Sequence, residues 1–232
     1  MSLLQTSAPA AHETRRTPRF DPPRPVKEAV KAAILKVKRI ETGAAAPHPP
    51  TNPGASQPPT AALYLPTIHP SVVRGGEGTV RIGRGSSVGR RCELQARGGA
   101  ISLGEGSTLA GDVRLITYSG AIRVGDDSVI VSYSIVYGGG GVTIGDHVLI
   151  GNHSVISGLD HTYPGRDSVA RSPMREAPVF IGDDVWVGGY CLVMAGVTIG
   201  EGAIVGAHSL VRDDVPPFAV VAGRPARLVR MR

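Results

Sequence analysis

The residue with the clearest potential for chemistry is His161, in the segment Asp160-His161-Thr162-Tyr163-Pro164. An imidazole titrates near neutral pH, so it can accept a proton from a weakly acidic group such as a hydroxyl. Asp160 is next to it, but neighbouring side chains of an extended backbone point apart, so a backbone carbonyl would orient the ring equally well. We predict that His161 acts as a general base.

Three other histidines, His147, His153 and His208, each lie three residues after an aliphatic residue of a regular pattern. That register directs them outward, as solvent-exposed or subunit-interface side chains. His153 precedes the His161 segment, and lining the same cleft is a second interpretation for it.

The two cysteines, Cys92 and Cys191, each lie four residues after an aliphatic residue of the same pattern. This register directs both thiols inward. They lie four coils apart, which is roughly 19 Å if successive coils are spaced by about 4.8 Å. That separation is too large for a disulfide. We expect two buried, reduced thiols without a catalytic role, as in a cytosolic protein.

The elements that position these residues follow from a six-residue repeat. Aliphatic residues recur at every sixth position, and a small or β-branched residue follows each of them after four positions. In the clearest stretch the aliphatic series is Ile181, Val187, Val193, Ile199, Val205 and Val211, and the second series is Val185, Cys191, Val197, Ala203, Ser209 and Val215. A fixed short period is typical of a solenoid, whose coils stack short parallel strands.

The repeat predicts six coils that start at Ile82, Leu103, Val124, Ile144, Ile181 and Ile199. Glycine-rich stretches, including residues 138–141, are expected at corners, where they permit positive φ or close backbone approach. The pattern fails only over residues 157–178, the segment that contains His161. A long loop that interrupts a tight repeat is more often functional than incidental, so we predict the active-site loop here.

Composition divides the chain into three parts. Residues 1–66 are rich in Pro and Ala and are expected to be largely disordered, apart from a basic amphipathic helix over 26–40. Residues 67–215 hold the repeat, and residues 216–232 form a C-terminal cap and basic tail. The net charge of +6 allows an anionic partner, but no signature of nucleic-acid binding is present. We also find no secretory signal and no segment long and apolar enough to span a membrane.

From about residue 80 onward, the sequence resembles the hexapeptide-repeat acyltransferases, in particular the branch of maltose, galactoside and polysaccharide-biosynthesis O-acetyltransferases. Three features carry the resemblance: the repeat, the loop motif "DHTYP", and the stretch "IGDDVWVGGYCLVMAGVTIGEGAIVGAHSLVRDDVPPFAVVAGRPAR" at residues 181–227.

The resemblance implies an all-β fold, a left-handed parallel β-helix, assembled as a homotrimer with active sites between neighbouring subunits. It implies acetyl-CoA as co-substrate, with no tightly bound cofactor and no metal, and a hydroxyl acceptor on a sugar or polysaccharide precursor. The expected mechanism is direct attack in a ternary complex, with His161 matching the family's catalytic base.

The resemblance also suggests residues for the two substrates. Trp186 is expected to lie against the pantetheine arm, and small residues beside it leave the backbone accessible. The expected donor site comprises Trp186, Gly188, Gly206, Ala207, Arg212, Arg224, Pro225 and Arg227, with the arginines as partners for phosphate. The expected acceptor site comprises Ser132, His153 and Asp160. Ser132 falls near the position of an acceptor-binding Asn in galactoside-type relatives, so the sequence departs from their pattern there.

Two alternatives remain open at this point. A zinc enzyme like the γ-type carbonic anhydrases would need three converging histidines, for which His147, His153 and His161 are the candidates. A non-catalytic β-helix scaffold is the other. We expect a cytoplasmic protein, with weak contact to the inner face of the membrane through residues 26–40.

Overall fold

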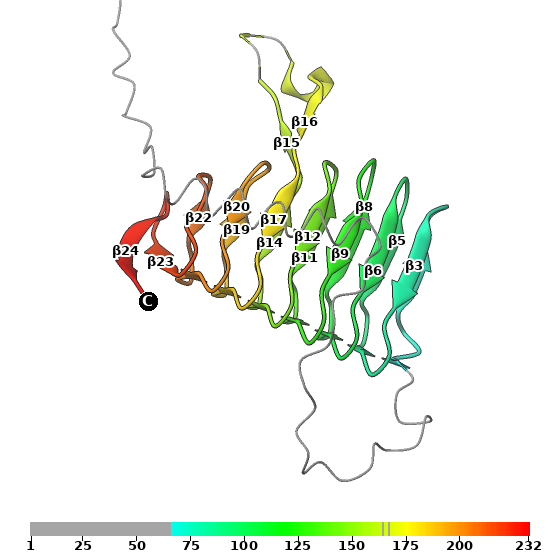
Figure 1. Cartoon of the computed structure of the whole chain (residues 1–232). Coiled ribbons are helices and arrows are strands. Elements are labelled where there is room, and N and C mark those ends of the chain that lie inside the picture. Colours follow the sequence, from blue (N-terminus) through cyan, green and yellow to red (C-terminus); the bar gives the residue numbers. More distant parts are fainter. Residues whose placement is uncertain (1–65, 164, 167) are drawn as a thin grey trace, which may run out of the picture.

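The structure is a computed structural model that describes residues 66–163, 165–166 and 168–232. These residues form a parallel β-solenoid whose coils stack along one axis, with three sheets as its sides (Figure 1). The prediction of an all-β parallel β-helix is confirmed. The helix predicted over residues 26–40 lies outside the described residues, as does the N-terminal extension except for its last residue. No helix among the described residues is long and apolar enough to cross a membrane.

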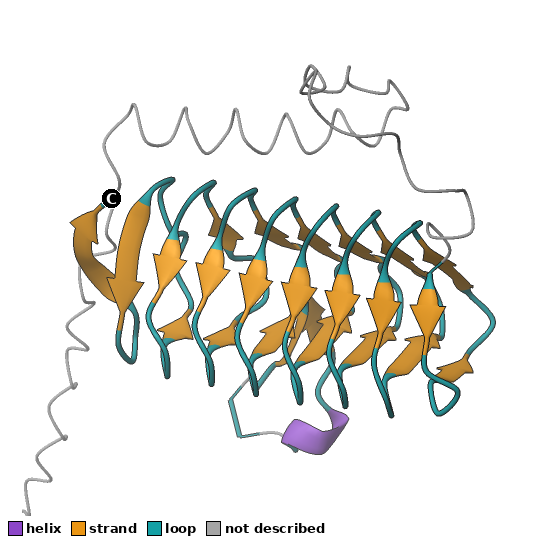
Figure 2. Cartoon of the chain, turned by 90° about the horizontal axis from the view of Figure 1, so that it is seen from below, coloured by secondary structure: helices purple, strands orange, loops and turns teal. Residues whose placement is uncertain are grey.

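Each sheet collects at most one parallel strand from each coil, and the rows of strands are visible in Figure 2. Sheet A contains β1 (Thr67–Ile68), β4 (Ser87–Val88), β7 (Thr108–Leu109), β10 (Val129–Ile130), β13 (Leu149–Ile150), β18 (Trp186–Val187), β21 (Ile204–Val205), β23 (Ala219–Ala222) and β24 (Arg227–Met231). Sheet B contains β2 (Val73–Gly75), β5 (Glu93–Ala96), β8 (Arg114–Thr117), β11 (Ile135–Gly138), β14 (Val155–Ser157), β19 (Leu192–Val193) and β22 (Leu210–Val211). Sheet C contains β3 (Thr79–Ile82), β6 (Ala100–Leu103), β9 (Ile122–Val124), β12 (Val142–Ile144), β17 (Val179–Ile181) and β20 (Thr198–Ile199).

The solenoid starts earlier and ends later than the predicted coils. Strands β1, β2 and β3 already form a coil that begins before Ile82. At the other end, β24 pairs antiparallel with β23 and covers the last parallel strand of sheet A. The return strand β24 thereby replaces β23 as the edge strand of sheet A.

The core is a column of aliphatic side chains inside the three sheets. All six members of the series from Ile181 to Val211 are buried, and so are the six members of the second series. The buried core among the described residues contains no aromatic side chain, as the low aromatic content predicts. The six-residue period therefore marks two inward positions on every side of the solenoid.

The two corners that border sheet A place their residues differently. At the corner between sheets C and A, glycine occupies the positive-φ position of three coils, at Gly85, Gly106 and Gly202. At the corner between sheets A and B, no coil uses glycine. There the positive-φ residues are Arg91, Asp112, Tyr133, His153, Tyr190 and His208. A left-handed backbone costs a non-glycine residue roughly 1–2 kcal/mol. Each of these residues at the A–B corner therefore carries a conformational cost that glycine would avoid.

Candidate active site

The predicted interruption of the repeat forms a two-stranded arm. Strands β15 (Leu159–His161) and β16 (Met174–Glu176) pair antiparallel, and the short 3-10 helix η2 (Val169–Arg171) lies between them. The arm is inserted between β14 of sheet B and β17 of sheet C, and it extends away from the coils (Figures 1 and 2). We predicted a loop here, and the hairpin was missed.

The pairing register assigns the side chains of the arm to two faces. Asp160 lies opposite Arg175, and His161 lies opposite Met174. Since neighbouring residues of a strand point to opposite faces, Asp160 and Arg175 share one face while His161 is on the other. The carboxylate of Asp160 contacts Arg175 at 3.4 Å between Oδ2 and Nη2. Asp160 therefore pairs across the arm and is turned away from the imidazole beside it.

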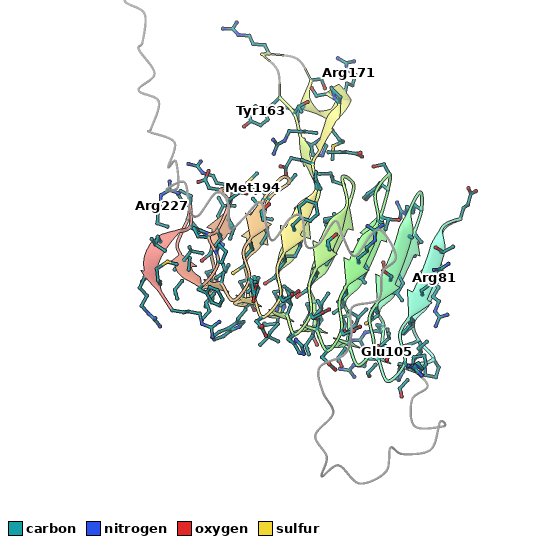
Figure 3. The ribbon with its side chains drawn as sticks, in the orientation of Figure 1. Arg81, Glu105, Tyr163, Arg171, Met194 and Arg227 are labelled. Atoms are coloured by element: carbon teal, nitrogen blue, oxygen red, sulfur yellow. The ribbon has the colours of Figure 1, made fainter. Side chains whose placement is uncertain are left out.

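His161 is exposed, and the arm continues beyond it into solvent. Tyr163 is 78% exposed, and both Tyr163 and Arg171 lie far from the coils (Figure 3). The imidazole makes no salt bridge or side-chain hydrogen bond within the described part of the chain. In this arrangement the ring is exposed to solvent.

The glycine-rich stretch at residues 138–141 makes room for the base of the arm. A Cβ atom on Gly139 would lie 2.6 Å from the side chain of Leu159, and one on Gly140 would lie 2.5 Å from the backbone of Ala177. The amide of Gly140 also donates to the carbonyl of Gly158 at 2.8 Å. The close approach of the arm thus requires glycine at these two positions. This explains the glycine-rich stretch that the sequence showed here.

The A–B corner brings several of the predicted site residues together. Ser132 and His153 are adjacent across two coils, where the amide of His153 donates to the carbonyl of Ser132 at 3.1 Å. On the next two coils the same corner holds Gly188, Gly206 and Ala207. Trp186 lies on sheet A directly before this corner and is 51% exposed. Ser132 and His153 are therefore followed along a single edge by Gly188, Gly206 and Ala207, whereas Asp160 is on the arm and Arg212 follows β22 at the B–C corner.

Coil stacking also accounts for the small residues at this edge. A Cβ atom on Gly188 would lie 2.6 Å from the amide nitrogen of Ala207, and one on Gly206 would lie 3.0 Å from the Cβ of Ala222. The close packing of coils is thus sufficient to explain these glycines. Their value for a ligand would be the backbone that they leave uncovered.

Four rings form a continuous column at the A–B corner, a feature that sequence reasoning missed. Tyr133, His153, Tyr190 and His208 stack in that order, with centroid distances of 4.9, 4.7 and 4.9 Å. Both faces of the His153 ring are covered by tyrosines. Its Nδ1 lies 2.9 Å from the side-chain nitrogen Nδ2 of Asn152, so Nε2 remains available for a ligand. The four residues occupy the same turn position of successive coils, and that shared register was the available signal.

The predicted phosphate partners divide into two groups. Arg212 and Arg227 both approach the carboxylate of Asp213, at 3.7 and 3.3 Å. Arg224 donates from Nε to the carbonyl of His208 at 2.9 Å, at the end of the ring column, and Pro225 follows it. All three arginines are exposed, and Arg227 lies near the C-terminal end of the solenoid (Figure 3).

The fold keeps the arm and the A–B corner apart within one chain. His161 is on an arm that leaves the corner between sheets B and C (Figure 1), whereas Trp186 is on β18 of sheet A, the side that does not border this corner. The three histidines considered as zinc ligands are likewise distributed over three corners, with His147 between sheets C and A. One copy of the chain brings neither set together.

Both cysteines are buried, as predicted, and their thiols donate to backbone carbonyls of the next coil. The acceptor of Cys92 is Ala110 at 2.9 Å, and that of Cys191 is Gly206 at 3.2 Å. Burial raises the pKa of both thiols above the ordinary cysteine value. Neither thiol is reactive in this setting, because the thiolate is the nucleophilic form.

Comparison with known proteins agrees with the fold and with the repeat. Residues 178–213 match the family "Bacterial transferase hexapeptide (six repeats)". The chain is 40% identical over 90 residues to a galactoside O-acetyltransferase of Escherichia coli K12, a match covering 38% of this chain and 43% of the relative. It is 39% identical over 69 residues to a chloramphenicol acetyltransferase of Agrobacterium fabrum, covering 30% of this chain and 33% of the relative.

A solved structure supports the same fold. A variant of AntD, an N-acyltransferase from Bacillus cereus in complex with dTDP and coenzyme A, superposes with a TM-score of 0.54 at 22% identity, covering 68% of this chain and 84% of that one. The chain spans less than half of the length of the curated relatives named above. Together these matches confirm the resemblance to the hexapeptide-repeat acyltransferases.

Proposed function

We propose that this hexapeptide-repeat protein is an acetyl-CoA-dependent O-acetyltransferase that acts on a hydroxyl of a sugar or polysaccharide precursor. The observation that carries the proposal is the arm: the one long interruption of a transferase repeat presents an exposed imidazole, His161. A galactoside O-acetyltransferase among the relatives favours a sugar acceptor.

In the proposed reaction His161 takes the proton of the acceptor hydroxyl as its oxygen attacks the thioester carbonyl of acetyl-CoA. The tetrahedral intermediate then collapses, the carbon–sulfur bond breaks, and the proton passes from the imidazolium to the departing thiolate of CoA. The products are the acetyl ester and free CoA. We propose direct transfer in a ternary complex, and the burial of both cysteines agrees with a reaction that has no acyl-enzyme on sulfur.

The donor would lie along the A–B corner. Trp186 offers an exposed aromatic face to the pantetheine arm, and the backbone at Gly188, Gly206 and Ala207 offers amide and carbonyl groups. The segment Arg224–Pro225 and the pair Arg212 and Arg227 would hold the phosphates, since guanidinium groups bind them in a bidentate manner.

The acceptor would lie at the same corner, on the coils of Ser132 and His153 that precede the coils of the donor site. Ser132 can hydrogen-bond a sugar hydroxyl, and His153 offers the Nε2 atom of a ring that its two tyrosine neighbours hold in place. Asp160 finds less support as an acceptor ligand, because its side chain is on the face of the arm opposite His161.

The active site would be completed by a second copy in a homotrimer. Within one chain His161 and Trp186 face different sides, yet the arm leaves the solenoid at the level between the coils of His153 and Tyr190. A rotation about an axis parallel to the solenoid preserves that level and closes a ring. The arm also carries Arg166 and Arg171, while the C–A corner that borders sheet A presents exposed Asp127 and Asp184, so the charges are complementary.

The zinc alternative finds less support. His147, His153 and His161 lie at three corners, and both faces of the His153 ring are covered. We place the reaction in the cytoplasm, and a contact between residues 26–40 and an anionic membrane would add a weak attachment.

The experiment is an acceptor screen with acetyl-CoA, detecting the thiol of released CoA. The expected result is acceptor-dependent thiol release with at least one sugar or glycan precursor. Stoichiometric zinc in the purified protein without thiol release would favour the hydratase, and no acetyl-CoA binding by calorimetry would favour a scaffold.

A further inference from the structure

Two adjacent side chains, those of Arg175 and Glu176, add to the backbone contacts at Gly139 and Gly140 that attach the base of the arm to the solenoid. Arg175 donates from Nη2 to the carbonyl of Ala195 at 2.9 Å, and the same nitrogen lies 3.4 Å from Oδ2 of Asp160. Ala195 belongs to the coil that follows the arm. Arg175 therefore joins both strands of the arm to the coil above them.

Glu176 makes the opposite attachment. Its Oε2 lies 2.5 Å from the hydroxyl of Ser119, which is also 2.5 Å from the carbonyl of Gly139. Ser119 and Gly139 belong to two coils that precede the arm. Because adjacent residues of a strand point to opposite faces, Arg175 reaches one way and Glu176 the other. We call these two attachments the arm bracket.

Beyond the bracket, the side-chain hydrogen bonds between described residues of the arm are internal. Thr162 donates to the carbonyl of Pro173 at 2.5 Å, and Ser172 donates to the carbonyl of Ser168 at 3.1 Å. No hydrogen bond joins the described residues between His161 and Met174 to the solenoid. The angle at which the arm leaves the coils is thus set at its base, one residue pair before His161.

Taking the proposed acetyl transfer as its premise, we propose that Arg175 is a positioning residue for His161. Arg175 does not share the face of His161, so it acts through the direction of the arm and not by contact. A displacement of about 1 Å at a reacting group can cost on the order of 10²-fold in rate. A small change in the direction of the arm at its base would displace His161 by such a distance, even if the arm stayed folded. The exposed ion pair itself contributes little to global stability.

The test compares Arg175→Gln with Arg175→Lys and with Arg84→Gln as the matched control. Arg84 forms an exposed cross-coil ion pair with Glu105 at 3.1 Å, far from the arm along the solenoid. In Arg175→Gln we expect kcat to fall about 10–100-fold while KM for acetyl-CoA stays within about twofold. Arg175→Lys keeps the positive charge and the donors but has a shorter, differently shaped head group, so it should recover part of kcat. Arg84→Gln should leave both constants unchanged.

Hydrogen–deuterium exchange supplies a readout that needs no activity. The amides of β15 and β16 should exchange faster in Arg175→Gln than in the wild type, with sheet A unchanged. Unchanged exchange in the arm would overturn the proposal, and so would faster exchange with wild-type kcat. If the wild-type protein released no thiol with any acceptor, the proposed function would fail, while the exchange result would still decide whether the bracket holds the arm.

Discussion

The inward position of the A–B corner shows how one slot accepts chemically different residues. Cys92, Ser134, Ser154 and Cys191 all occupy it, and each donates to a carbonyl on the next coil. Val113 fills the same position with a buried apolar side chain, so the position tolerates a donor but does not require one. The cysteines are therefore structural equivalents of serine in this solenoid.

The buried thiols predict a pH dependence of stability. Their pKa values are raised in the folded state, so their contribution is complete below the unfolded pKa of about 8.5 and is lost as pH rises through the folded pKa. We expect the free energy of unfolding to fall above about pH 8.5 in the wild type, by at most about 1.4 kcal/mol per pH unit for each thiol.

The double variant with Cys92→Ser and Cys191→Ser lacks these titrating groups and is the control for all other groups. Urea unfolding between neutral and alkaline pH measures both proteins. Parallel curves for the two proteins across this range would show that the thiols ionise as easily in the folded state as in the unfolded state.

At the scale of elements, the six-residue period predicts the strands of the solenoid well. The anchors from Ile181 to Val211 can be read directly, because only inward positions must be aliphatic and small. The same logic correctly placed Cys92 and Cys191 inside and His147, His153 and His208 outside, near corners.

The arm could not be predicted as a hairpin by the same logic. Strands β15 and β16 are exposed for much of their length, so neither needs an alternation of apolar and polar residues. Its attachment depends on Arg175, Glu176 and close packing against Gly139, contacts between segments far apart in the sequence. The stacking of the four rings was not predicted for a related reason. The inserted arm separates His153 from Tyr190 in the sequence, so their common position in the coils is not visible from a fixed spacing.

At the scale of the whole molecule, the candidate site is divided between two sides of one solenoid. The A–B corner gathers Ser132, His153, Gly206 and Ala207, and sheet A adds Trp186, whereas His161 leaves from the opposite corner. A chain with this distribution would need a neighbour to complete the reaction.

Mixing two inactive variants tests that division. His161→Ala removes the base from the arm, and Trp186→Ala removes the aromatic face from sheet A. Mixed assemblies would contain some sites with an intact arm from one chain and an intact sheet A from its neighbour, so co-refolding should restore thiol release that neither variant has alone. Mixing His161→Ala with His161→Gln should restore nothing. Activity no greater than the sum of the separate variants would place both residues in a site of one chain.

If His161 removes the proton of the acceptor hydroxyl during acetyl transfer, its loss must slow the release of CoA. The most direct test measures thiol release at saturating acetyl-CoA by the wild type, by His161→Ala, and by His147→Ala as a control at a different corner. We predict a loss of roughly 10²–10⁴-fold in kcat for His161→Ala, the usual contribution of a general base, with assembly size and the His147→Ala rate unchanged. Full activity in His161→Ala would contradict the account.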